Sequence, residues 1–95
     1  MQKKKQIPGT IVVVEWIDAL TLDQWSDIKF RIEEHKEPVV VLTVGIVLQH
    51  IDDYIVLARS IQLRGNSTEG SFQIPSGMIQ SIKKLNYPLV TIDTN

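Results

Sequence analysis

The chain has 95 residues, a formal charge of −1 and no cysteine. This length fits one domain, and the lack of cysteine excludes disulfides, thiolate zinc sites and cysteine nucleophiles. The balanced charge lacks the basic excess of proteins that hold nucleic acid mainly through phosphates. No apolar stretch is long enough to span a membrane, and the basic start reads unlike a signal peptide, so we expect a cytoplasmic protein without membrane contact.

The first predicted strand runs from Thr10 to Asp18 and follows a segment, residues 1–9, that we expect to be a flexible tail. Its side chains alternate between two faces, and only Glu15 interrupts the apolar pattern. We therefore expect both faces to be covered. One face carries Val12, Val14 and Trp16, and the other carries Ile11, Val13 and Ile17.

The segment from Thr21 to Pro38 is predicted to hold a short helix. Thr21 to Gln24 fits an N-terminal capping box, and Pro38 would end the element. Apolar residues recur at helical spacing and would pack as one stripe on the sheet: Leu22, Trp25, Ile28 and Ile32. The alternation from Ile28 to Ile32 also suits a strand, which leaves that interpretation open.

Two apolar strands follow, Val39 to His50 and Tyr54 to Leu63, joined by a tight turn at residues 51–53. Gly45 predicts a bend or a close backbone approach. A change of apolar phase near Arg59 predicts a bulge or the rim of a barrel. Strands this apolar predict a small closed or sharply bent sheet that is buried on both sides.

The remainder predicts shorter elements. Residues 65–70 read as a loop, followed by a fourth strand from Ser71 to Ile74 and a turn at residues 75–77. A fifth strand is expected from Met78 to Leu85, and residues 89–92 could add an edge piece. The chain is thus expected to be mainly β, with one short helix or excursion between its first two strands.

The order of these features resembles the Sm-like (Lsm and Hfq) family over residues 39–85. Gly45 and Asp52 look like the glycine and aspartate of that family, and Asp53 to Leu57 resembles the segment after the aspartate. Residues 74–79 sit where its second motif joins strands four and five, with Pro75 and Gly77 in the turn. The chain is also similar to small Sm-like proteins of marine phages (cyanophages), which carry a segment between strands one and two.

The resemblance implies a five-stranded, strongly bent antiparallel barrel of Sm-like or SH3-like type, acting in the cytoplasm of the host cell. It implies a ring of five to seven identical subunits, in which strand four of one pairs with strand five of the next. Apolar edges would otherwise be left open. The expected interface residues are Phe72, Gln73, Ile74, Met78 and Ile79.

The resemblance also implies RNA as a partner, held near the pore of the ring. Tyr54 suits base stacking. The other candidate contacts are Gln49, Asp53, Ser76 and the basic residues Lys3, Lys4 and Lys5.

Three departures from the family favour an alternative function. Val56 stands where Sm proteins have asparagine, and residues 75–77 replace the basic residues of the second motif. Asp52 and Asp53, repeated around a ring, would repel phosphate. The alternative is an oligomeric barrel that serves as a protein-interaction or assembly module without binding nucleic acid.

No enzyme chemistry is predicted. His50, Asp52 and Asp53 are too close in sequence to point into one metal site, so the acids are interpreted as turn formers. The serines and the two histidines give no nucleophile, base and acid arrangement. We therefore expect no cofactor, no metal, no catalytic residue and no small-molecule substrate.

Overall fold

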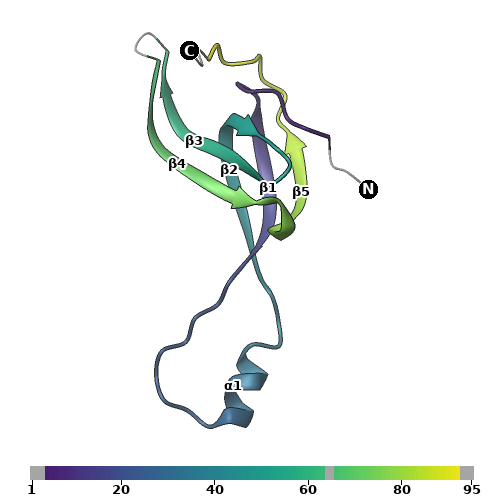
Figure 1. Ribbon diagram of the computed structural model, residues 1–95, viewed down its shortest axis with the longest axis vertical. Helices are drawn as coiled ribbons and strands as arrows, with labels where there is room; N and C mark the ends of the chain where they lie inside the picture. Colours follow the sequence, from purple (N-terminus) through teal and green to yellow (C-terminus); the bar gives the residue numbers. More distant parts are fainter. Residues whose placement is uncertain (1–3, 64–65, 93–95) are drawn as a thin grey trace.

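The computed structural model describes residues 4–63 and 66–92. It contains five strands, one short α-helix and one 3-10 turn (Figure 1), in the order β1 (Ile11–Asp18), α1 (Ile28–Glu34), β2 (Val39–His50), β3 (Tyr54–Gln62), β4 (Ser67–Pro75), η1 (Ser76–Met78) and β5 (Ile79–Lys84). All ladders are antiparallel, and the strands form one sheet in the order β4-β3-β2-β1-β5. The predicted mainly-β, five-stranded antiparallel class is confirmed. The sheet is curved but not closed, with β4 and β5 as its edge strands.

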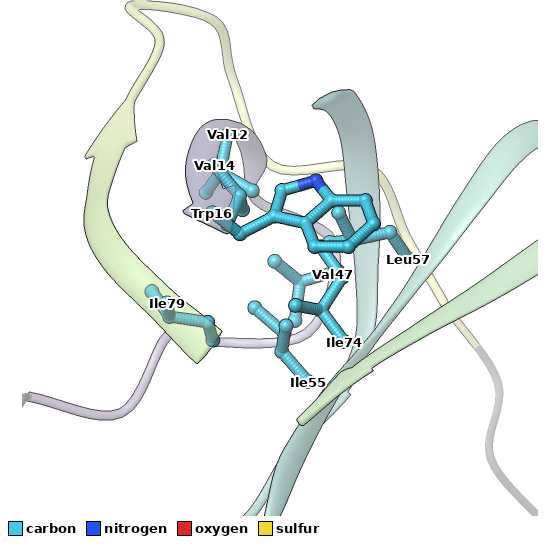
Figure 2. Packing of buried hydrophobic residues seen from close by; sticks show 8 residues of the cluster. All are labelled: Val12, Val14, Trp16, Val47, Ile55, Leu57, Ile74 and Ile79. Atoms are coloured by element: carbon cyan, nitrogen blue, oxygen red, sulfur yellow. The ribbon is translucent and has the colours of Figure 1, made fainter. Parts of the chain in front are cut away.

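The core lies on the concave side of this sheet, where side chains from all five strands converge (Figure 2). Most are aliphatic, as the composition predicts: Val12, Val14, Trp16, Val47, Ile55, Leu57, Ile74 and Ile79. The indole Nε1 of Trp16 donates a hydrogen bond to Thr43 Oγ1 at 2.9 Å, which satisfies its one polar atom. The outer face of β1 is only half-buried at Ile11, Val13 and Ile17, so the expectation of two covered faces is wrong.

Gly45 allows β2 to approach β3 closely, as predicted. A Cβ atom at this position would lie 2.9 Å from Leu57 Cβ and 3.2 Å from the carbonyl oxygen of Ala58. The β2–β3 ladder begins next to this point, at the pair Ile46 and Ala58. Gly45 therefore marks the place where the two strands separate.

Of the two alternatives near Arg59, the bulge is wrong. The β3–β4 register runs without a shift from Tyr54 opposite Pro75 to Gln62 opposite Ser67. The shift occurs instead in β2, between Val47 and Gln49. At Arg59, β3 has parted from β2 and no longer covers the core, which explains the change of apolar phase.

Residues 19–38 form an arm that extends away from the sheet and carries α1 at its end (Figure 1). The short helix is confirmed, but it begins at Ile28 rather than at Thr21, and Asp27 caps it by accepting a hydrogen bond from the amide of Phe30 at 3.3 Å. Trp25 is fully exposed, and Ile28 and Ile32 are also exposed. The predicted packing of this stripe on the sheet is wrong, because the β1–β2 hairpin carries the segment away from the core.

Both ends of the described chain contact the sheet. Gly9 donates its amide hydrogen to the carbonyl oxygen of Val47 at 2.8 Å and accepts a hydrogen bond from the amide of Val90 at 2.9 Å. Residues 89–92 pass beside Gly9 but do not form the edge strand that the sequence predicts. Of the predicted loop 65–70, residue 65 lies outside the described residues, and residues 67–70 belong to β4, where they pair with the end of β3.

Candidate functional site

One end of the sheet gathers most of the predicted RNA-contact residues. Gln49 is the second-last residue of β2, the acids follow in the β2–β3 turn, Tyr54 opens β3, and Ser76 lies in η1. The ladder partner of Tyr54 is Pro75, and the amide of Ser76 donates to the carbonyl oxygen of Asp53 at 2.8 Å. We call this group the turn surface: Gln49, Asp52, Asp53, Tyr54 and Ser76.

Tyr54 is the aromatic residue of the turn surface. Its side chain is half-buried, and its hydroxyl donates to Gln49 Oε1 at 3.5 Å, near the long limit of a hydrogen bond. The ring is therefore positioned between β2 and β3 while part of it remains open to solvent. A half-open aromatic ring beside an amide suits a flat ligand such as a nucleic-acid base.

The N-terminal segment crosses this end of the sheet and changes its charge. The Lys5 ammonium forms an ion pair with the Asp52 carboxylate, and that hydrogen bond and positive charge lower the pKa of Asp52 below its ordinary value. Both side chains are well exposed, so the pair adds little to stability. Its consequence is electrostatic, because Lys5 balances one of the two acids in the turn. Lys4 is exposed nearby in sequence, and Lys3 lies outside the described residues.

His50 is engaged in holding this segment. Its Nδ1 accepts a hydrogen bond from the amide of Gln6 at 2.8 Å, which fixes the path that brings Lys5 to Asp52. Among the residues that the structure describes, no three histidine or acidic side chains gather closely enough to hold a metal ion. His50 and Asp52 instead hold the N-terminal segment against the β2–β3 turn.

The predicted interface residues divide between the core and the surface. Ile74 and Ile79 are buried in the core of the chain itself, so they could offer a neighbour only their backbone. Phe72 and Met78 are exposed, and the Phe72 ring also contacts Trp16 with 5.4 Å between centroids. Gln73 is exposed on β4.

A second open region was not predicted from the sequence. The first half of β2 lies next to β1 alone, and a cleft of about 250 Å³ opens where β2 and β3 separate. Its lining includes Val44, Ala58, Arg59 and Phe72. The length of β2 was the available signal, because a strand of 12 residues beside one of 9 leaves part of its edge unpaired.

Comparison with protein-family models, with curated proteins and with solved structures finds no match to this chain. Within residues 4–63 and 66–92, the helical segments are too short and too polar to cross a membrane.

Proposed function

We propose that this chain is an assembly module of Sm-like type, whose copies join edge to edge in a ring of five to seven subunits. One observation carries the proposal: β4 and β5 are the two outer strands of a single curved sheet, so each has an open edge. Pairing β4 of one copy with β5 of the next satisfies both rows of backbone groups. Such a head-to-tail contact ends in a closed ring when its rotation closes.

The distribution of apolar side chains supports association. Among the described residues, 15 large hydrophobic side chains are exposed, whereas nine hydrophobic residues are buried. Phe72 and Met78 belong to the exposed set and flank the β4 and β5 edges. Apolar surface on this scale is a feature of chains that bind to a partner or to one another.

A proline in β4 tests the ring. The amide of Ser76 points toward β3, so by alternation the amide of Gln73 points to the open edge. We expect Gln73→Pro to remove a hydrogen bond between subunits without breaking the β3–β4 ladder. Sedimentation velocity should show an oligomer larger than a dimer for the unmodified chain. For Gln73→Pro, which lacks the β4–β5 contact, it should show at most a dimer.

Gln73→Ala is the matched control, because it removes the same side chain and keeps the amide hydrogen. It should sediment as the unmodified chain does. An unmodified chain that is monomeric at micromolar concentration contradicts the proposed ring. Equal masses for the proline and alanine variants would contradict the β4–β5 contact.

RNA binding is the second candidate function, and the turn surface favours it. Tyr54 offers a ring for stacking, Gln49 offers an amide beside it, and Lys5 offsets the charge of Asp52. A ring would repeat this surface around its axis, so that weak contacts act together. Asp53 opposes the binding of phosphate, which is why assembly is placed first.

A fluorescent uridine-rich RNA, titrated at low and at moderate salt, tests this second function. We expect micromolar or tighter binding that weakens with salt, is lost in Tyr54→Ala and is kept in Tyr87→Ala, which removes another exposed tyrosine ring. An absence of binding at low salt would remove the RNA role and leave the assembly module intact.

A further inference from the structure

The first half of β2 is an open strand edge in the middle of the sheet. Residues 39–45 pair with β1 on one side, from Asp18 opposite Val39 to Val12 opposite Gly45. The ladder on the other side begins only at Ile46. This edge is separate from β4 and β5, on which the proposed ring depends.

The hydrogen bonds of Val47, near the C-terminal end of β2, show which backbone N–H and C=O groups of β2 point to the open edge. Val47 donates its amide to the carbonyl oxygen of Thr10 and accepts from the amide of Gly9, both at 2.8 Å, so its groups point toward the β1 side. The β1–β2 register has no shift, and alternate residues point to opposite sides. The backbone groups of Val40, Leu42 and Val44 therefore point to the open edge.

This edge lacks the features that protect exposed strands. Natural edges carry charged residues, prolines or bulges that prevent pairing with another chain. Residues 39–49 contain no charged residue and no proline, and the three side chains of Val40, Leu42 and Val44 are exposed. The edge is thus an apolar, uncharged template for another strand.

We propose that a second copy of this chain occupies the edge, with the two β2 strands antiparallel about a two-fold axis at Leu42. In this register Leu42 faces Leu42 of the second copy, and Val40 faces Val44. The outward backbone groups of the three residues then meet the same groups of the other copy, in about six hydrogen bonds. The exposed side chains form one continuous apolar stripe across both copies.

Self-pairing fits this edge better than a foreign strand for two reasons. The hydrogen-bonding phase and the apolar pattern are both symmetric about Leu42, which a two-fold contact requires. An edge without charge also offers no electrostatic feature by which another protein would be selected.

The antiparallel register also gives the arm a place to dock. It sets Pro38 of the second copy near Ile46, beside the cleft between β2 and β3. The C-terminal end of each copy's arm thus lies next to the cleft of the other copy. Trp25 and Phe30 on this arm offer roughly 300 Å² of aromatic surface, a large share of the roughly 800 Å² per partner in a stable interface.

Single cysteines test the two-fold register, because the chain has none of its own. Facing residues in a hydrogen-bonded antiparallel pair have Cα atoms about 5.5 Å apart, within the range of a disulfide. We expect Leu42→Cys to form an intermolecular disulfide under mild oxidation. Leu63→Cys is the control, because Leu63 is 72% exposed and Leu42 is 67% exposed; it should remain uncross-linked.

Cysteines in place of Val40 and Val44 test the register of the two β2 strands. The two copies of residue 40 would lie roughly 14 Å apart, so Val40→Cys alone should not cross-link. A mixture of Val40→Cys and Val44→Cys chains should cross-link to each other. If Leu42→Cys cross-links no faster than Leu63→Cys, the two-fold contact does not exist.

A charge at the axis provides the second measurement. Leu42→Glu places two carboxylates against each other, and each also lies opposite Glu15 in the β1–β2 ladder, so no cation offsets them there. Sedimentation should then show half the mass of the unmodified oligomer, whereas Leu63→Glu should leave the mass unchanged. An unchanged mass for Leu42→Glu overturns the proposal. The ring is tested separately, because Gln73→Pro should abolish it and leave cross-linking through Leu42→Cys intact.

Discussion

Of Gly45 in β2 and Gly77 in η1, only Gly45 lies where a side chain does not fit. An added Cβ at Gly45 would be 2.9 Å from Leu57 Cβ, an atom fixed to the backbone of a buried strand. An added Cβ at Gly77 would meet nothing within 4 Å. The two glycines therefore separate a packing requirement from a position in a turn.

We expect Gly45→Ala to lower the free energy of unfolding by about 1–3 kcal/mol, because β2 and β3 must move apart to admit the methyl group. Gly77→Ala should change it by less than about 1 kcal/mol. Urea unfolding of both variants measures the difference. Equal stability of the two variants would mean that the strands do not cross closely at Gly45.

Residue contacts at the turn surface were predictable only in part. Gln49 and Tyr54 flank the same tight turn, so their proximity follows from the sequence. The approach of Ser76 to Asp53 was expected through the family resemblance alone. The ion pair between Lys5 and Asp52 depends on the path of the N-terminal segment across β2, and no local pattern encodes that path.

At the scale of elements, apolar alternation predicted β2 at its observed ends and β1 to within one residue. The start of β4 was missed because residues 67–70 are polar and include a glycine. These residues are exposed on both faces, so backbone pairing with the end of β3 places them in the strand without any apolar signal.

The helix shows a different limit of sequence patterns. Helical spacing of Trp25, Ile28 and Ile32 indicates an apolar stripe, but it does not say which surface covers that stripe. The segment lies beyond the end of the β1–β2 hairpin, too far from the core to pack on it. Asp27 rather than Thr21 begins the helix, since the residues before it extend along the arm.

At the scale of the whole molecule, the chain is more extended than a compact domain of its length. Its radius of gyration is 16.6 Å, whereas a compact domain of this length has one of about 12 Å. The difference comes from the arm, which Figure 1 shows standing apart from the sheet. Extended apolar segments of this kind gain stability when a second chain covers them.

The two tryptophans can report whether the arm is covered in the assembly. Trp16 is 7% exposed in the core, whereas Trp25 is fully exposed on the arm. We expect acrylamide to quench Trp25 strongly in dilute solution and less strongly as the protein concentration rises. Trp25→Phe leaves only Trp16, whose quenching should be weak at every concentration. If Trp25 stays equally quenchable while sedimentation shows an oligomer, the arm remains in solvent and assembly occurs through the sheet edges alone.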